Sequence, residues 1–461
     1  MTRREWLGRS VAVVISSRAG RPAGGALDAA GILKRVQPPV FPRRDFAITQ
    51  YGAVSDGEKL CSHAMADAVR ACSQAGGGSV IVPKGRFLTG AVHLESNVNL
   101  HLEEGATLAF SRDPKDYLPA VFTRFEGTEC MNYSPFIYAF EKTNIAVTGK
   151  GVLDGQAGPE HWWPWAGKAS MGWQKGTPNQ ENDRNTLTAM GDKDVAVAQR
   201  VFGEGHILRP NFIQFYRCAN VLLEDFRMIH SPMWEINPVL CRNVTMRGID
   251  IDSHGPNNDG CDPESCDGML ISNCTFSTGD DCIAVKAGRN RDGRRVNVPC
   301  QNVLIRDCVM KDGHGGVSIG SEVSGGIRNI LTEHCQMSSP NLERALRIKT
   351  NSYRGGVIEN IGFRNVTVGE VKEAVIEVDY FYQEGEGGTF MPSVRGIDIA
   401  NVTSEKSKYA IFMRGYKNSP VGGVTVASCT FQNSAEGTHF ENVEGVTLRN
   451  VTVNGKLLPA E

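Results

Sequence analysis

Carboxylate, imidazole and cationic side chains gather in four short motifs in the second half of the chain. They are Asn257-Asn258-Asp259, Gly279-Asp280-Asp281, Gly313-His314-Gly315 and Arg347-Ile348-Lys349. Three aspartates brought to one place repel one another, which raises the pKa of at least one of them. Such a group holds a protonated acid beside an ionised base, the pair that hydrolysis of a glycosidic bond requires. Asp259, Asp280 and Asp281 are therefore the predicted catalytic trio.

The other two motifs supply groups suited to an acidic sugar. His314 can hold or tune the trio, and its flanking glycines let a bulky sugar approach the backbone. Arg347 and Lys349 alternate on one face of a predicted strand, with Ile348 turned inward. Together they are suited to a substrate carboxylate. Each motif alone is common in turns, loops or solvated faces, so the site is predicted from their order and spacing.

A repeat along the chain predicts the elements that position these motifs. From residue 219 onward, Asn or Gly recurs before an alternating run rich in Val, Ile and Thr, as in Asn302-Val303-Leu304-Ile305. The aliphatic residue that opens each run stands at 221, 244, 269, 303, 330, 361, 397, 424 and 446. Such a unit cannot bury its own apolar face, but stacked units form a continuous core. The pattern predicts an all-β chain folded as a single parallel β-helix.

The separations between the motifs match single coils of such a solenoid. Asp259 and Asp280 are 21 residues apart, and 33 residues separate Asp281 from His314 and His314 from Arg347. Residues one coil apart stack about 4.8 Å from each other, so the motifs are predicted to share one face. Two adjacent aspartates can serve one site only at a bend, which Gly279 permits.

Two segments depart from the repeat. Residues 64–74 place apolar side chains on one helical face before a run of three glycines, which predicts a short helix capping the first coil. Residues 156–210 predict a long excursion, whose tryptophans either stack on sugar rings or pin the excursion to the wall. The predicted organisation is a leader or disordered arm over residues 1–40 and a β-helix catalytic domain over residues 41–461.

Charge and composition narrow the partners and the location. The formal net charge of −2 provides no bulk field toward nucleic acid or an acidic membrane, and a monomer is expected. No apolar run approaches the ~20 residues that span a bilayer. Arg3-Arg4-Glu5-Trp6-Leu7 resembles a twin-arginine export signal, so we expect a periplasmic or secreted protein; a disordered basic arm is the alternative.

The 13 cysteines are an odd number and do not predict a disulfide scaffold. Cys274, Cys308, Cys335 and Cys429 recur at one position of the repeat, where a small buried hydrophobic residue is expected. Cys261 and Cys266 lack a second pair at zinc-finger spacing, so no metal site is predicted.

The four motifs together resemble those of the polygalacturonases, the pectin-degrading glycoside hydrolases of family 28. That family's Asn-Thr-Asp, Asp-Asp, Gly-His-Gly and Arg-Ile-Lys motifs match the four phrases above, the first imperfectly. The phrase at 51–57, Tyr-Gly-Ala-Val-Ser-Asp-Gly, is similar to the opening of these enzymes. The resemblance covers residues 45–455. It implies a right-handed β-helix, an inverting mechanism, no metal or organic cofactor, and pectin or oligogalacturonides as the acidic polysaccharide partner.

The resemblance also implies a role for each catalytic residue. Asp280 would be the general acid, and Asp259 and Asp281 would together activate the attacking water. His314 would support the acid.

The same resemblance implies the substrate contacts. Arg347 and Lys349 would bind the galacturonate carboxylate. Tyr380 falls near a substrate-contacting tyrosine of the family, and Tyr382 competes for that position.

One departure from the family pattern points to exo-acting bacterial members. Asn258, assigned to substrate binding, stands where polygalacturonases usually carry threonine, and the sequence around it looks more like the exo-acting enzymes. The insertion at 288–295 holds four arginines, of which Arg289 and Arg294 are the candidates for binding a terminal acidic sugar. These arginines would close one end of the cleft; the alternative is a solvated loop.

Three other functions remain open from sequence alone. The same fold could hydrolyse rhamnogalacturonan or a substituted pectin. It could be a calcium-dependent lyase, although the Gly-His-Gly and Arg-Ile-Lys motifs argue against that. It could also be a carbohydrate-binding solenoid without catalysis, which the intact trio disfavours.

Overall fold

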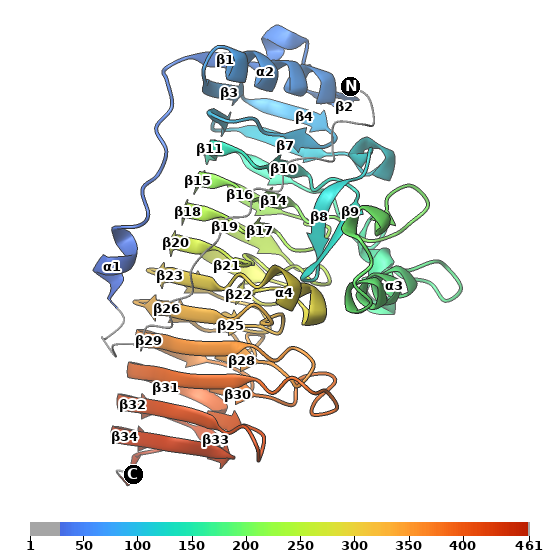
Figure 1. Ribbon diagram of the computed structural model, residues 1–461. Coiled ribbons are helices and arrows are strands. Elements are labelled where there is room, and N and C mark those ends of the chain that lie inside the picture. Colours follow the sequence, from blue (N-terminus) through green and yellow to red (C-terminus); the bar gives the residue numbers. More distant parts are fainter. Residues whose placement is uncertain (1–27, 460–461) are drawn as a thin grey trace, which may run out of the picture.

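The computed structural model describes residues 28–459, which fold as a right-handed parallel β-helix (Figure 1). Coils stack along one axis from α2 at the N-terminal end to β34 at the C-terminal end. The predicted fold class is confirmed. The twin-arginine phrase and most of the predicted leader lie outside the described residues.

Each coil turns at a residue with positive φ, which explains the Asn or Gly of the repeat. Asn220, Asn243 and Asn302 have φ of 57°, 55° and 57°, and Gly268 has 80°. Asparagine tolerates this left-handed region because its short amide can hydrogen-bond locally. The amides also join neighbouring coils, since Asn220 Nδ2 donates to Asn144 Oδ1 at 2.8 Å and Asn243 Nδ2 donates to Asn220 Oδ1 at 2.8 Å. This ladder fixes the register of the stack.

The strands form three faces. The first face contains β1 (Asp45–Ala47), β3 (Gly78–Val82), β6 (Val98–Leu102), β11 (Thr143–Gly149), β15 (Ala219–Glu224), β18 (Arg242–Arg247), β20 (Asp267–Ser272), β23 (Cys300–Arg306), β26 (Ile327–Glu333), β29 (Val357–Glu370), β31 (Ser393–Arg414), β32 (Val421–Phe431) and β34 (Val443–Val453). The second face contains β2 (Asp56–Leu60), β4 (Gly85–Thr89), β7 (Ala106–Phe110), β12 (Val152–Asp154), β16 (Arg227–Ile229), β19 (Asp250–Ser253), β21 (Thr275–Thr278), β24 (Val309–Met310) and β27 (Gln336–Met337). The short β35 (Lys456–Leu457) pairs antiparallel with β34.

The third face carries the predicted site. It contains β5 (Val92–His93), β10 (Ile137–Phe140), β14 (Ile213–Tyr216), β17 (Ile236–Val239), β22 (Ile283–Val285), β25 (Val317–Ile319), β28 (Arg344–Lys349), β30 (Ala374–Asp379) and β33 (Ser434–Glu441). Between β17 and β22, Cys261 and Glu264 form single bridges to both neighbours, so the face is continuous.

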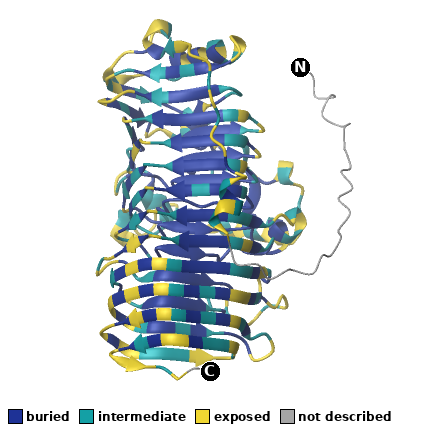
Figure 2. Cartoon of the chain, turned by 90° about the vertical axis from the view of Figure 1, so that its left-hand side faces the viewer, coloured by how far each residue is buried: buried dark blue, intermediate teal, exposed yellow. Residues whose placement is uncertain are grey.

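Inward-facing aliphatic side chains from all coils form one core. Val221, Val244, Met269 and Val303, which open successive repeats, are completely buried and aligned by the strand pairing. Figure 2 shows the buried residues running down the stack, with exposed residues alternating on the last coils. Cys274, Cys308, Cys335 and Cys429 are buried as predicted. All 13 cysteines lie among the described residues, and each is unpaired.

The N-terminal end of the solenoid is closed by helix α2 (Ser62–Gln74). Its Met65, Ala68, Val69 and Cys72 are buried against the first coil. The capping helix is therefore confirmed, two residues longer at its start than predicted.

Residues 28–40 pack on the solenoid, although we predicted an arm apart from the fold. Helix α1 (Ala29–Leu33) buries Ile32 against Leu304 and Leu331 on the first face. The Gln37 backbone N–H also donates to Asn243 Oδ1 at 2.7 Å. A single isoleucine covering two leucines on the outer side of the sheet is a contact between distant residues, so it leaves no periodic signal in the sequence.

A small second sheet projects beside the third face. Strands β8 (Val121–Phe125) and β9 (Thr128–Asn132) form a hairpin, and β9 also pairs with β13 (Val201–Phe202) at the end of the excursion. The excursion itself contains the helix α3 (Glu181–Asp192). Residues 28–459 also contain five short 3-10 turns: η1 (Ile48–Tyr51), η2 (Pro114–Tyr117), η3 (Trp163–Ala166), η4 (Ala169–Met171) and η5 (Val197–Gln199), the last one just before β13. Figure 1 shows this sheet and α3 on one side of the stack.

The tryptophans of the excursion pin it to the wall. Trp162 is 3% exposed and lies edge-on to Tyr117 and Phe136. Trp163 Nε1 donates to the carbonyl of Ser231 at 2.9 Å.

Candidate active site

The structure brings Asp259, Asp280 and Asp281 together at the entrance to the third face. One carboxyl oxygen of each aspartate lies within 4.8 Å of those of the other two. Asp259 precedes the bridge residue Cys261, and the aspartate pair precedes β22. The expected bend is present, and Gly279 is required there because a Cβ would come within 2.2 Å of the Gly255 carbonyl oxygen.

Asp281 is the anchored member of the trio. It is completely buried, and its Oδ1 accepts a hydrogen bond from Ser318 Oγ at 2.8 Å. Lys349 Nζ lies 2.6 Å from its Oδ2, and Arg347 Nη1 lies 3.6 Å from its Oδ1. Burial acts to raise the pKa of Asp281, but the charges of Lys349 and then Arg347 outweigh it and hold the pKa well below the ordinary range. Asp281 is therefore a carboxylate over the working pH range.

Asp280 is the accessible member. Its side chain is 16% exposed, whereas those of Asp259 and Asp281 are 4% and 0% exposed. His314 Nδ1 lies 3.0 Å from Asp280 Oδ1. Burial acts to raise the pKa of Asp280, but the hydrogen bond from His314 outweighs it and the net pKa is lowered. The same hydrogen bond raises the pKa of His314.

Asp259 has the opposite electrostatic surroundings. Burial raises its pKa well above the ordinary range, and the neighbouring charges of Asp262 and Asp280 add to the effect. Its Oδ1 is buried without a hydrogen-bond partner among residues 28–459. In the free protein, the proton that the trio shares therefore lies on the Asp259 side. Because interacting carboxyls titrate as a unit, the proton belongs to the trio and can pass to Asp280 over this short distance.

Arg347 and Lys349 lie next to the trio, on the outer side of β28. Besides Asp281, Arg347 contacts Glu377, with Nε 3.5 Å from Oε1. The ring of Tyr382 covers both cations, 5.5 Å from the Arg347 guanidinium carbon and 5.2 Å from Lys349 Nζ. The structure thus places Tyr382 at the site.

The assignment of Tyr380 to substrate binding is wrong. Tyr380 is completely buried, and its hydroxyl accepts a hydrogen bond from the Val394 backbone N–H at 2.9 Å. Asp379 is paired with Lys349 on the outer face of the third sheet, so the next residue turns inward.

Asn258 does not contact the cleft either. It is completely buried, and its Nδ2 donates to the carbonyls of Ser231 and Met233, both at 3.1 Å. Its Oδ1 accepts from Ser253 Oγ at 2.7 Å and from the Gly255 N–H at 2.8 Å. The side chain has no donor or acceptor left for a sugar, and it holds the loop that presents Asp259.

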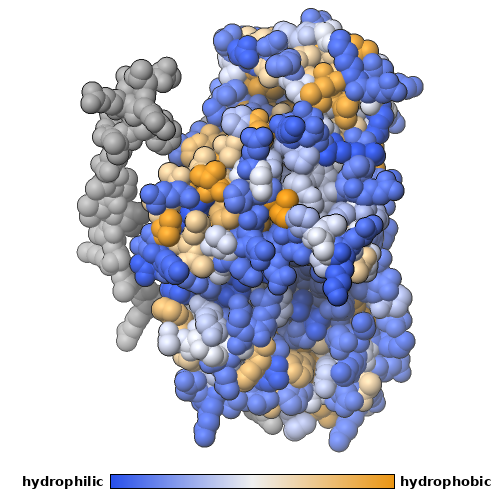
Figure 3. All heavy atoms as spheres, turned by 90° about the vertical axis from the view of Figure 1, so that its right-hand side faces the viewer, coloured by the Kyte–Doolittle hydropathy of each residue, from blue (hydrophilic) through white to orange (hydrophobic). Residues whose placement is uncertain are grey.

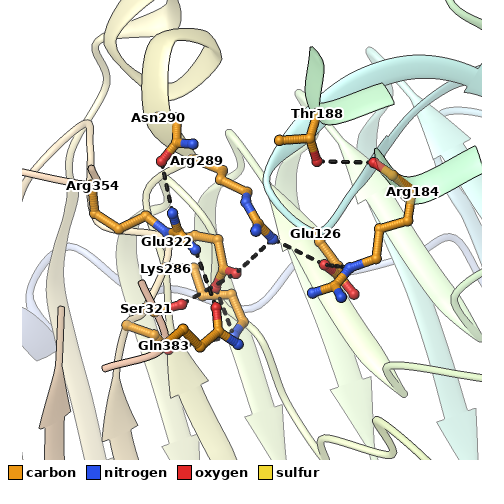
Figure 4. Close-up of polar contacts among 12 residues, drawn as sticks. Glu126, Arg184, Thr188, Lys286, Arg289, Asn290, Ser321, Glu322, Arg354 and Gln383 are labelled. Carbon is orange, nitrogen blue, oxygen red and sulfur yellow. Dashed lines mark hydrogen bonds and ion pairs between the residues drawn. The ribbon is translucent and has the colours of Figure 1, made fainter. Parts of the chain in front are cut away.

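The two arginines of the insertion have different surroundings. The insertion forms the helix α4 (Asn290–Val296). Arg289, 8% exposed, bonds Glu126 with Nη1 3.0 Å from Oε2 and also lies near Glu322 and Glu384. Arg294 lies farther out, stacked over Phe390 at 3.5 Å, and lines an outer cavity of about 680 Å³. Arg289 is thus the member of the insertion that joins Glu126 to Glu322, as Figure 4 shows.

The hairpin covers the third face on the N-terminal side of the trio. Gln214 Nε2 on β14 donates to the Arg124 carbonyl at 3.1 Å, and Tyr138 Oη on β10 donates to the Phe122 carbonyl at 2.5 Å. The Arg124 guanidinium lies 3.1 Å from Glu264, one coil before β22. Phe125, Cys130, Leu187, Phe202, Leu208, Met233 and Trp234 form a separate small core beneath it.

The tip of the hairpin is bonded to helix α3 and to the residue that precedes helix α4. Glu126 accepts from Arg184 Nε of α3 at 2.6 Å and from Arg289 Nη1 at 3.0 Å, as Figure 4 shows. At Gly127, φ is 81° and a Cβ would come within 2.8 Å of the Arg289 nitrogen. The face is therefore closed on the N-terminal side of the trio.

A second hollow lies beside His314. A cavity of about 390 Å³ adjoins His314 and is also lined by His254, Asn341, Glu343 and Lys372. Figure 3 shows that this loop-bearing side is hollowed near its middle and mainly hydrophilic around the hollow.

Several residues around the trio were not predicted from the sequence. Lys286 and Glu322 lie behind the trio, and Glu126 and Arg184 close the wall. The hairpin had only a weak signal, the glycine Gly127 between two short runs, and the structure makes Glu126-Gly127 a two-residue turn with φ of 42° and 81°. The sequence held no sign of the role of Lys286, because its partners lie on different coils.

Comparison with known proteins agrees with this geometry. Residues 202–454 match the family model described as glycosyl hydrolases family 28. A probable polygalacturonase of Vitis vinifera is 28% identical over 427 residues, covering 87% of this chain and 78% of that protein. An exo-poly-alpha-D-galacturonosidase of Dickeya chrysanthemi is 25% identical over 466 residues, covering 89% and 74%.

Among solved structures, a hyperthermoactive exopolygalacturonase from Thermotoga maritima is similar over nearly its whole length. The TM-score is 0.90 at 45% sequence identity, covering 93% of this chain and 96% of that one.

Proposed function

This chain belongs to glycosyl hydrolase family 28, and from that membership we propose that it removes galacturonate units from one end of a pectic chain by hydrolysing α-1,4 bonds. The relatives described as polygalacturonases support the substrate. Exo action is supported by one observation above all: the hairpin covers the third face directly on the N-terminal side of the trio. A polymer cannot continue through a wall whose Arg289 and Glu126 are nearly buried.

The carboxylate of the sugar at the cleavage point lies against Arg347 and Lys349. A carboxylate accepts well from a guanidinium and an ammonium, and the Tyr382 ring over both offers a flat surface for the sugar. Binding of this anion also offsets the charge of Lys349, one of the groups that lower the pKa of Asp280. Substrate binding thereby moves the shared proton toward Asp280.

Hydrolysis then needs one proton transfer at each end of the reaction. Asp280, the exposed aspartate, donates its proton to the glycosidic oxygen as the bond to the anomeric carbon breaks. A water attacks that carbon and gives its proton to Asp259, with Asp281 holding the water through its negative charge. The products are one free sugar and the shortened chain, and the trio regains its starting proton count.

The stereochemical course proposed is inversion. Inverting enzymes generally keep their carboxyl groups about 6.5–9.5 Å apart and retaining ones about 5–5.5 Å, so a separation within 4.8 Å would by itself favour retention. Burial argues the other way, because a carboxylate that bonds to the sugar must reach it. Asp259 and Asp281 are 4% and 0% exposed, so a small water reaches them and an anomeric carbon does not.

Product analysis tests the proposal. Wild type and Asp280→Asn are incubated with polygalacturonate and with rhamnogalacturonan, and the products are sized over time. Galacturonate monomer from the first time point is expected with polygalacturonate only, and a ladder of oligomers would contradict exo action. Turnover of rhamnogalacturonan alone would replace the substrate assignment.

We further propose that the protein is a monomer outside the cytoplasm, where the polymer is found. No helix among residues 28–459 is long and apolar enough to cross a membrane. Replacing Arg3-Arg4 with two lysines and fractionating cells tests the location, because a twin-arginine substrate would then stay in the cytoplasm.

A further inference from the structure

Lys286 lies directly behind the trio on the coil that carries Asp280 and Asp281. Its Nζ is 3.9 Å from Asp259 Oδ2, 3.4 Å from Asp262 Oδ1 and 3.3 Å from Glu322 Oε2. The side chain is 4% exposed, and its ammonium sits 4.6 Å from the centre of the Trp234 ring. Figure 4 shows Lys286 reaching Glu322 from the next coil. The ammonium is surrounded by these three carboxyl groups and the Trp234 ring, so its charge acts on its neighbours.

We propose that Lys286 is a positioning residue that places the proton of the trio: its charge favours the ionised form of Asp259, so that the proton can move from Asp259 to Asp280 when substrate binds. The inference rests on the proposed function and adds a residue to it. Without a cation behind it, Asp259 would keep the proton even after substrate binds, and the trio would lose its base and its acid together.

The charges around Asp259 make this role specific to Lys286. Three carboxyls oppose ionisation of Asp259, those of Asp262, Asp280 and Asp281. Lys286 is the cation whose charge most lowers the pKa of Asp259. Arg209 also acts on Asp259 electrostatically, but its hydrogen bonds go to Gln180, to Asn257 and to two backbone carbonyls.

Glu322 and Asp259 share the Lys286 ammonium. A change at Glu322 should therefore shift the pKa of Asp259 in the opposite direction to a change at Lys286. Burial acts to raise the pKa of Glu322, but Lys286 and then Arg289 lower it to about 2, so Glu322 is ionised whenever the enzyme works. Removing the Glu322 charge leaves Lys286 to act on Asp259 and Asp262, which should lower the pKa of Asp259. Removing the Lys286 charge should raise the pKa of Asp259.

The experiment compares Lys286→Met with Glu322→Gln in the pH dependence of kcat/KM on trigalacturonate. The rate rises with pH as the base ionises, so the midpoint of the acid limb follows the pKa of the base. Lys286→Met should move that midpoint up by about one to two pH units, and Glu322→Gln should move it down by about half a unit. KM should change little in either variant. Lys286→Arg, which keeps the charge, should restore most of the wild-type midpoint.

A structural role alone predicts a different result. It lowers activity equally at every pH, lowers the melting temperature, and leaves the midpoint in place. Unmoved midpoints in both variants, or shifts of the same sign, would overturn the inference. If Lys286→Met fails to fold, the downward shift in Glu322→Gln still decides the question.

A substrate-free measurement separates this inference from the proposed function. Infrared titration of the carboxyl band in the free protein, with Asp259→Asn subtracted, follows Asp259 directly. The band should titrate at higher pH in Lys286→Met than in wild type, whatever the substrate. If the wild type does not cleave galacturonans, the proposed function is wrong. The titration still tests the effect of Lys286 on Asp259, because it uses no substrate.

Discussion

Replacing Lys349 with methionine should destabilise the protein far more than removing an equally short ion pair on its surface. Lys349 Nζ and Asp281 Oδ2 are 2.6 Å apart, with side chains 6% and 0% exposed. Removing one partner of a buried pair leaves an uncompensated charge and costs about 3–5 kcal/mol. Ser318 and Arg347 still contact Asp281, which places the expected loss in the free energy of unfolding near the lower figure, about 3 kcal/mol.

The matched control is Lys406→Met. Lys406 Nζ lies 2.7 Å from Glu370 Oε1, almost the same distance, but the two side chains are 63% and 37% exposed. An exposed pair contributes about 0.2–1 kcal/mol, so this variant should melt close to wild type in urea. The second control is the double variant Lys349→Met with Asp281→Asn, which removes the stranded charge. It should recover at least about 1 kcal/mol of the loss, while activity stays abolished.

The stability lost in Lys349→Met should depend on pH in a definite direction. The pKa of Asp281 is held well below its ordinary value in the folded protein, so its charge contributes stability above the unfolded pKa of about 3.9. That contribution is lost as the pH falls toward the folded value. The gap between wild type and Lys349→Met should therefore be widest near neutrality and narrow below about pH 4. A loss no larger than that of Lys406→Met, or a double variant as unstable as the sum of the singles, would refute the reasoning.

Three further outcomes follow from the site. Asp280→Asn should lower kcat about 10²–10⁴-fold on trigalacturonate with KM nearly unchanged, because it removes the acid and keeps the shape; an equal loss in KM would point to binding instead. Arg184→Ala should release the hairpin tip at Glu126, so that chromatography of polygalacturonate digests shows oligomers beside the monomer, and unchanged products would clear this contact of a role in exo action. Proton NMR during the first turnovers should show the β-anomer of galacturonate, and an initial α-anomer would establish retention.

The repeat made the fold predictable because its information is local. Each coil carries its own alternating strand and its own residue for the left-handed turn, so Asn243 or Gly268 marks a corner wherever it stands. The trio was predictable for the same reason. Asp259 and the pair at 280–281 follow one another at coil length, and the stacking distance is fixed by the sheet.

Residues outside the strands were not predictable in this way. Loops of unequal length leave each coil, so the inward or outward direction of Tyr380 depends on its register with Lys349, which the sequence does not state. The arginines of the insertion were expected to close one end of the cleft, but nothing in the sequence indicated that Arg289 would bond Glu126, on a hairpin some 160 residues earlier. Contacts between such distant segments leave no periodic pattern.

Charged residues of alternating sign lie where the chain leaves successive strands of the third face. This alternation allows several charged side chains to lie close together below the surface. Glu264 is bridged to Lys286 in the strand ladder, Lys286 contacts Glu322 at 3.3 Å, and Arg354 lies 3.4 Å from Glu384. The charge of Arg354 also helps to lower the pKa of Glu322, which joins the two halves of the row. Lys286, Glu322 and Arg354 thus each have an opposite charge about one coil away on either side, which offsets the cost of their burial.

This alternating row makes a graded prediction. Neutralising a member should move the acid limb of the pH profile in a direction set by its sign and by an amount that falls with each coil from Asp259. Glu384→Gln, two coils beyond Glu322 and 37% exposed, should shift the midpoint in the same direction as Glu322→Gln but by no more than about 0.2 pH units, because solvent screens it. The measurement is kcat/KM on trigalacturonate against pH for both variants at two salt concentrations. A larger shift in Glu384→Gln than in Glu322→Gln would mean that the substrate, and not the row, carries the effect.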